Sequence, residues 1–120
     1  MGIQWIEYKG NKVLYVDYSG IKMEREMVAM VNQIPPFLHD IKPGEKLLVL
    51  VDLNNCYTTP GFIEASKKLE KEFLDQFIVK RAVLGVTGPK AVLLKGYNIF
   101  ASQKLEPFTT KDAALEFLVR

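Results

Sequence analysis

The chain has 120 residues, of which 48% are hydrophobic and 25% are charged, so its length and composition fit one domain with an ordinary packed core. Its formal charge of +2 and the mixed signs along its predicted helices argue against nucleic acid as a partner. The longest apolar runs, about five residues, are far shorter than the roughly twenty that span a bilayer, so no transmembrane segment is expected.

The cellular compartment is predicted from the cysteine count and the N-terminus. Cys56 is the single cysteine, so no intrachain disulfide can form, which fits a reducing compartment. The N-terminus lacks the basic and apolar regions of a signal peptide. We therefore expect a cytoplasmic protein.

The first predicted elements form an antiparallel hairpin. Residues 3–9 and 12–18 are rich in aromatic and β-branched side chains, which favour strands. Between them, Gly10 and Asn11 tolerate the positive φ that a two-residue turn requires.

A helix is predicted over residues 21–33, because apolar residues recur there at helical spacing and two prolines follow. Met23, Met27 and Met30 fall on its apolar stripe. Such a stripe usually packs in the core, but flexible methionines also form adaptable binding surfaces, so both interpretations stay open.

Residues 46–52 form an uninterrupted apolar run that ends at Asp52. Such a run predicts a strand that is buried on both faces of a sheet. A helix is predicted to follow, with Thr59 as its N-cap and Pro60 in its first turn.

The rest of the chain continues the alternation of strands and helices. Residues 78–86 predict a second buried strand, and Gly88 and Pro89 precede a third helix. A short edge strand is predicted around Pro107, and a final helix over residues 111–119. The order ββαβαβαβα predicts one α/β domain over residues 1–120, with a mixed sheet of about five strands and about four helices.

The candidate site is the polar segment after the central strand, because α/β proteins commonly bind ligands beyond the carboxyl ends of their strands. Its residues are Asp52, Asn54, Asn55, Tyr57, Thr58 and Thr59. The carboxylate and the two amides can bind a polar ligand or form Asx turns within the loop. The two threonines are candidate phosphorylation sites, although capping alone also explains a threonine at position 59.

The sequence contains no complete catalytic or metal-binding signature, so we expect a protein that is not an enzyme and uses no metal or cofactor. Cys56 lies near a predicted helix N-terminus, which can activate a thiol. Nucleophilic catalysis also needs a base, and His39 is the single histidine. Two isolated residues define no geometry, so we expect Cys56 to be semi-buried and inert.

The order of elements resembles the STAS domain, the fold of sporulation anti-anti-sigma factors. The sequence is most similar to the STAS-like subgroup that is often grouped with CRAL-TRIO lipid-binding domains. The matching segments are residues 5–8, 13–20, 48–52, 80–88, 107–108 and 113–118. The resemblance covers nearly the whole chain through strand and turn patterns.

In STAS proteins of the sigma-factor pathway, a partner kinase phosphorylates a Ser or Thr at the start of the helix after the central strand. The resemblance places this position at residues 57–60. The usual Asp-Ser-Ser-Gly motif is replaced here by Asn-Asn-Cys-Tyr-Thr-Thr-Pro-Gly over residues 54–61.

Two functions follow as expectations. The first is a non-catalytic regulatory or protein-interaction module, whose protein partner contacts the loop from Asn54 to Thr59. The alternative is a carrier of a small apolar molecule or lipid, which predicts an apolar pocket of several hundred cubic ångströms. A homodimer through the first strand or an exposed helix face is compatible with either function.

Overall fold

A computed structural model describes residues 2–101 and 103–120. The chain begins with an antiparallel hairpin of β1 (Gly2–Tyr8) and β2 (Asn11–Asp17). The predicted turn is wrong by one residue, because Lys9 and Gly10 form it, with φ of 49° and 80°. Asn11 instead pairs with Tyr8 as the first residue of β2.

The following elements have the predicted order. They are α1 (Glu24–Asn32), the 3-10 turn η1 (Pro35–Leu38), β3 (Lys46–Asp52), α2 (Pro60–Glu72), the 3-10 turn η2 (Leu74–Gln76), β4 (Ile78–Leu84), α3 (Pro89–Phe100), β5 (Leu105–Phe108) and α4 (Lys111–Val119). The described residues thus form five strands and four α-helices. The first helix begins later than predicted, because Met23 has extended backbone and serves as its N-cap.

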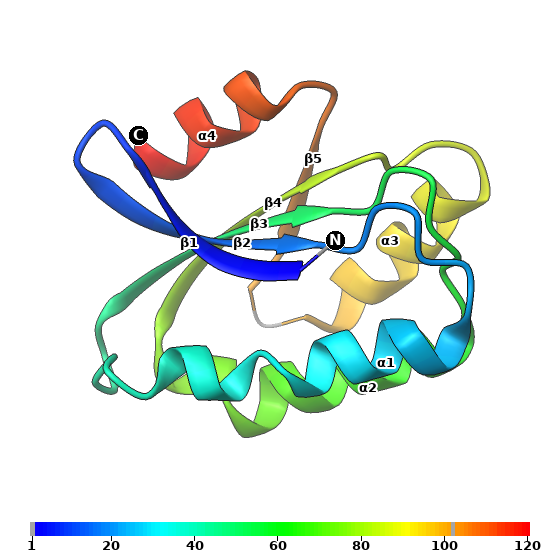
Figure 1. The fold of residues 1–120 in the computed structure, drawn as a ribbon, viewed down its shortest axis with the longest axis horizontal. Coiled ribbons are helices and arrows are strands. Elements are labelled where there is room, and N and C mark those ends of the chain that lie inside the picture. Colours follow the sequence, from blue (N-terminus) through cyan, green and yellow to red (C-terminus); the bar gives the residue numbers. More distant parts are fainter. Residues whose placement is uncertain (1, 102) are drawn as a thin grey trace.

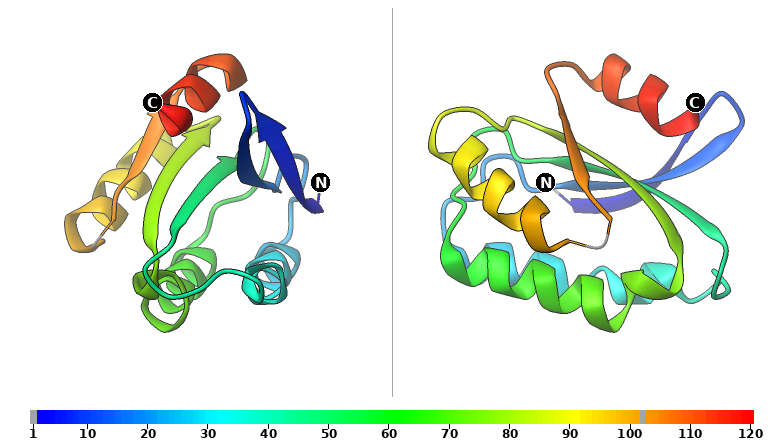
Figure 2. Two further views of the ribbon diagram at one scale, coloured as in Figure 1. Left: turned by 90° about the vertical axis from the view of Figure 1, so that its left-hand side faces the viewer. Right: turned by 180° about the vertical axis from the view of Figure 1, so that it is seen from behind.

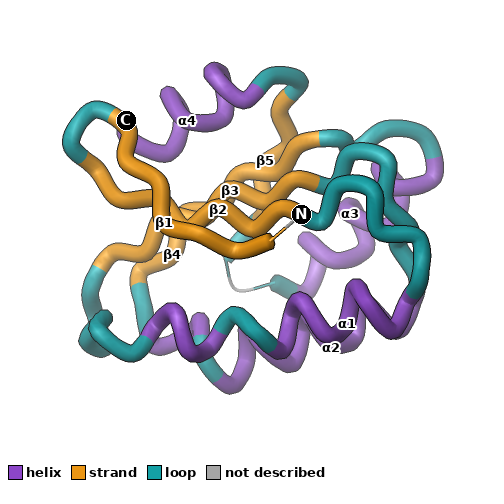
Figure 3. Tube along the Cα trace, in the orientation of Figure 1, coloured by secondary structure: helices purple, strands orange, loops and turns teal. Residues whose placement is uncertain are grey.

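The five strands form one mixed sheet in the order β1-β2-β3-β4-β5 (Figures 1 and 3). β1 is antiparallel to β2, and every later pair of neighbours is parallel. The strand that contains Pro107 lies at the edge, as predicted, where a residue without an N–H group is tolerated.

Helices cover both faces of the sheet. Helices α1, α2 and α3 lie on one face and α4 lies on the other (Figures 1 and 2). The larger core lies beneath α1–α3 and includes Met27 and Met30, which are buried. A smaller core of β-sheet and α4 side chains includes Leu50 and Leu118. Because both faces are covered, the central strand contains an apolar run with no polar alternation.

The methionine stripe is therefore mainly core. Met27 is fully buried and Met30 is 6% exposed, whereas Met23, outside the helix, is 48% exposed. The binding-surface interpretation does not hold for the two methionines within α1.

Candidate functional site: the loop between β3 and α2

Three parallel strands end level with one another beside the candidate loop. Asp17, Asp52 and Leu84, the last residues of β2, β3 and β4, are neighbours in register. The loops that follow these strands consequently meet at one edge of the sheet, on the right in Figure 1. This edge is the one at which α/β folds commonly bind ligands.

Asp52 holds the start of the loop in an Asx turn. Its Oδ1 accepts hydrogen bonds from the backbone N–H of Asn54 at 2.9 Å and from the Asn54 side-chain amide at 2.8 Å. Its Oδ2 accepts a bond from the Tyr15 hydroxyl at 3.2 Å. Burial, with the nearby charges of Asp17 and Asp52, raises the pKa of Tyr15 to about 12. Both oxygens of the Asp52 carboxylate thus have partners within the protein.

Asn55 fixes the middle of the loop. It adopts a left-handed backbone with φ of 53°, which asparagine tolerates better than most residues. Its side-chain oxygen accepts a hydrogen bond from Lys22 at 2.7 Å, and its carbonyl accepts one from the N–H of Gly20 at 3.1 Å. The N–H of Tyr57 donates to Ile21 at 2.9 Å. These hydrogen bonds hold the loop against residues 20–22, the segment that leads into α1.

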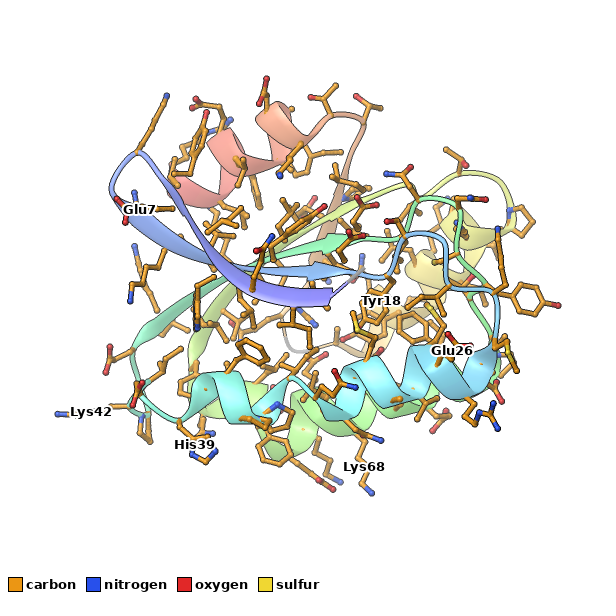
Figure 4. The ribbon with its side chains drawn as sticks, viewed as in Figure 1. Glu7, Tyr18, Glu26, His39, Lys42 and Lys68 are labelled. Atoms are coloured by element: carbon orange, nitrogen blue, oxygen red, sulfur yellow. The ribbon has the colours of Figure 1, made fainter. Side chains whose placement is uncertain are left out.

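Cys56 is buried below the loop. It is 7% exposed, and its thiol donates to the Leu53 carbonyl at 3.3 Å. Burial raises its pKa, so the thiol stays protonated at neutral pH. The single histidine, His39, is exposed and follows η1, beyond the opposite end of α1 (Figure 4). His39 therefore lies too far from Cys56 to act as a base for its thiol.

Thr59 is the N-cap of α2, as predicted. Its hydroxyl accepts a bond from the N–H of Phe62 at 3.3 Å and donates to Glu24 Oε1 at 2.5 Å. The same Glu24 oxygen accepts a bond from the N–H of Gly61 at 3.1 Å. A carboxylate from α1 therefore lies at the positive end of α2, where a negative charge is favourable.

The two residues that precede Thr59 differ in their exposure to solvent. Tyr57 is 59% exposed, although its backbone is held by Ile21. Thr58 is half-buried and lines a small apolar cavity of about 80 Å³ between the sheet and the helices α2 and α3. Of the candidate residues, Tyr57 thus offers the large apolar surface to a partner.

A buried polar network beside this cavity was missed by sequence reasoning. Arg81 on β4 donates to the Tyr97 hydroxyl at 2.9 Å, to Glu70 at 3.2 Å, and to the carbonyl of Gln103. The Tyr97 hydroxyl donates to Glu70 at 2.5 Å. Burial raises the pKa of Tyr97 to about 12. A signal existed, because an arginine within an apolar strand needs buried partners.

No group of three or more His, Cys, Asp or Glu side chains among the described residues is arranged to hold a metal ion. Within the same part of the chain, no helix combines the length and apolar character needed to cross a membrane.

Comparison with known proteins identifies the class of fold. The structure resembles the crystal structure of an uncharacterized protein from the DUF3478 family of Shewanella loihica PV-4, which has a SpoIIAA-like fold, with a TM-score of 0.74. The match covers 98% of this chain and 92% of that chain, at 19% sequence identity. The protein thus has the SpoIIAA-like, or STAS-like, α/β fold that its sequence predicted. At this identity, the likeness establishes the fold alone.

Comparisons of the sequence alone identified no related family or protein. No protein-family profile matches the chain, and no curated protein sequence matches it.

Proposed function

We propose that this chain is a non-catalytic protein-interaction module of the STAS-like type, whose partner contacts residues 54–59 and the start of α2. The observation that carries the proposal is the exposure of Tyr57 on a fixed loop. Tyr57 is 59% exposed, while hydrogen bonds with Gly20 and Ile21 hold the backbone around it and Lys22 holds the Asn55 side chain. An exposed aromatic side chain on a pre-ordered loop is a favourable anchor, because little conformational entropy is lost on binding.

The partner surface is tested by comparing two single substitutions. Tyr57→Ala removes the proposed anchor, whereas His39→Ala changes an exposed residue at the opposite end of α1. Proteins captured from cells of the native host by each variant are quantified by mass spectrometry. We expect partners retained by the wild type and His39→Ala to be lost with Tyr57→Ala. Equal capture by all three proteins contradicts the proposed surface.

Phosphorylation at Thr58 or Thr59 is the proposed regulation of this module. A phosphate on Thr59 places additional negative charge beside Glu24, whose carboxylate now accepts the Thr59 hydroxyl and the Gly61 N–H. Repulsion between these groups then displaces Glu24 and frees the start of α1 from α2. Phosphorylation therefore acts by replacing one anion at the helix N-terminus with another.

This regulation is tested on protein purified from its own host. Intact-mass analysis and peptide mapping are expected to find phosphate on Thr58 or Thr59. Protein made synthetically with phosphothreonine at position 59 is expected to show faster amide exchange at Gly61 than the unmodified chain. Glu substitutions at both threonines are also expected to weaken an identified partner complex. Unchanged exchange and unchanged affinity contradict the switch.

The second candidate is a carrier of a small apolar molecule, and the cavity beside α2 and α3 is the observation that favours it. The cavity is lined mainly by apolar side chains, and the Nε–H of Arg81 beside it has no hydrogen-bond partner among the described residues. Its volume of about 80 Å³ is well below the several hundred cubic ångströms expected for a lipid. Native mass spectrometry of the host-purified protein tests this function, because a carrier releases a defined lipid or metabolite.

A further inference from the structure

The β1–β2 hairpin separates from the rest of the sheet at the end opposite the candidate loop. β2 pairs with β3 through residues 14–17 and 49–52. The preceding residues, 11–13 on β2 and 46–48 on β3, pair with their outer neighbours but not with each other. In Figure 1 the hairpin tip lies at the upper left and the start of β3 at the lower left. The facing strand edges consequently leave a wedge-shaped gap.

This gap contains a pocket of about 420 Å³, within the range of about 300–1,000 Å³ typical of ligand sites. Trp5 and Phe37, which pack against the core beneath α1–α3, line one part of it. Leu48 and Leu118, from the core beneath α4, line another part. A paired sheet keeps its two faces apart, so a pocket lined from both cores requires the strands to diverge.

Basic side chains surround the aromatic part of the pocket. Lys12 precedes Leu14 by two residues on β2, so it projects on the same face as Trp5, which is paired with Leu14. Lys46 lies across the gap at the start of β3. Neither lysine forms an ion pair with a described residue.

The lining carries charges of both signs. Arg120 adds a third basic residue, and Asp40 and Glu45 are the acidic ones. The Glu45 carboxylate already accepts the N–H of Lys42 at 2.9 Å, within its own turn. Two lysines without ion pairs beside two aromatic rings suit a planar apolar group that carries a negative charge.

We propose that this pocket binds a small aromatic carboxylate, with its ring against Trp5 and Phe37 and its carboxylate at Lys12 and Lys46. The gap closes where Leu14 meets Val49, so it is too short for an extended peptide to run through it. The site lies at the opposite end of the sheet from the proposed partner loop. Its occupation is therefore independent of the proposed function.

The chain carries its own reporter for this site, because Trp5 is its single tryptophan. Tryptophan fluorescence is measured during titration with phenylacetate, and with benzylamine and benzyl alcohol at the same ionic strength. We expect a saturable change with phenylacetate, and a much weaker response to the cationic and neutral probes. Loss of the two lysines in the Lys12→Gln/Lys46→Gln variant is expected to weaken phenylacetate binding by about tenfold.

The matched control is Lys68→Gln, which removes an exposed lysine on the outer side of α2 (Figure 4). It is expected to bind phenylacetate as the wild type does. Amide chemical shifts then locate the ligand, and we expect the largest changes at residues 11–13 and 46–48. Changes centred on α3 place the ligand in the apolar cavity and overturn the proposal. The proposal is also overturned if the phenylacetate titration does not saturate, if benzylamine gives an equal response, or if the double variant binds phenylacetate as the wild type does.

Discussion

At the scale of single residues, the absence of a side chain at Gly61 leaves room for the Glu24 carboxylate at the start of α2. A Cβ atom there would lie 2.4 Å from Glu24 Oε1, so any larger residue displaces the carboxylate from the helix N-terminus. Gly96, on the exposed side of α3, has no neighbouring atom within 4 Å of such a Cβ. Comparing substitutions at these two glycines therefore distinguishes the effect of the Glu24 contact from the effect of helix propensity.

We predict that Gly96→Ala stabilises the protein by about 0.5–1 kcal/mol, because alanine is the better helix former. Gly61→Ala gains less or becomes destabilising, since the Glu24 interaction with the helix end is lost. Urea denaturation of both variants gives the comparison. Equal stabilisation by the two substitutions shows that the Glu24 contact contributes nothing measurable.

The Arg81 network also belongs to the scale of single residues. Its side chains are buried, so each one needs the others as hydrogen-bond partners. Arg81 and Glu70 are 7% and 6% exposed. Removing one partner leaves the other charge buried without compensation, which typically costs about 3–5 kcal/mol.

We predict a cost of this size for Arg81→Met alone and for Glu70→Met alone. The double variant is expected to lose less than the sum of the two single losses, because no isolated charge is left. Tyr97→Phe, which removes one hydroxyl, is expected to cost about 1–2 kcal/mol. A double-mutant cycle in urea measures these values. Additive losses rule out energetic coupling within the network.

At the scale of elements, α2 and α4 begin in the same way. Thr59 and Thr110 are their N-caps, and each side-chain oxygen accepts a bond from a backbone N–H three residues later. Thr59 alone also donates to a carboxylate of another helix. The cap of α2 therefore joins two helices, whereas the described bond of Thr110 lies within its own helix end.

Thr110→Ala is predicted to cost about 1 kcal/mol, the usual value for a lost N-cap. Thr59→Ala is predicted to cost more, up to about 2 kcal/mol, because the bond to Glu24 is lost as well. Thr59→Ser retains the oxygen and is expected to stay within about 0.5 kcal/mol of the wild type. Denaturation midpoints and slopes in urea check this ranking, which fails if Thr59→Ala and Thr59→Ser are equally stable.

At the scale of the whole molecule, one contact joins the hairpin tip to the C-terminal helix. Glu116 on α4 accepts hydrogen bonds from the Tyr8 hydroxyl at 2.6 Å and from Lys9 at 2.5 Å. These bonds hold the pKa of Glu116 below its ordinary value of 4.5. A carboxylate with a lowered folded-state pKa stabilises the fold above its unfolded-state pKa, and this contribution is lost as the pH falls through the folded-state pKa.

We therefore predict that Glu116→Gln destabilises the protein at pH 7 and that its difference from the wild type shrinks as the pH falls below 4.5. Glu106→Gln, at an exposed position on β5, serves as the control for removing a carboxylate that does not contact the hairpin tip. Denaturation of the three proteins across this pH range provides the test. If the stability difference between Glu116→Gln and the wild type does not change with pH, the Lys9–Glu116 ion pair is not its cause.

The oligomeric state also belongs to this scale. β1 lies at one edge of the sheet, so its outer side is available to a second copy in the part of the chain that the structure describes. A homodimer through this strand stays a prediction, and light scattering of the purified protein checks it.

The sequence by itself determined the order of elements and the class of fold. The periodicity of residues 21–33, the apolar run before Asp52 and the Thr59-Pro60 pair are local signals, and each depends on near neighbours in the chain. The local signals do not determine where each element ends, because packing decides where a helix stops. Phe77 lies at helical spacing from Leu69 and Phe73, but it is buried beyond α2, after η2. The STAS-like fold followed from these patterns.

Only the tertiary structure decided which side chains act together. Glu24 meets Thr59 across 35 residues, Arg81 joins Glu70 and Tyr97, and the gap between β2 and β3 arises from the twist of the hairpin away from the sheet. No local pattern encodes such contacts, because each depends on how two separate elements are placed. The same physical reason limited the prediction of the site: the sequence located the loop, and the fold determined that Tyr57 faces outward while Cys56 and Thr58 face the core.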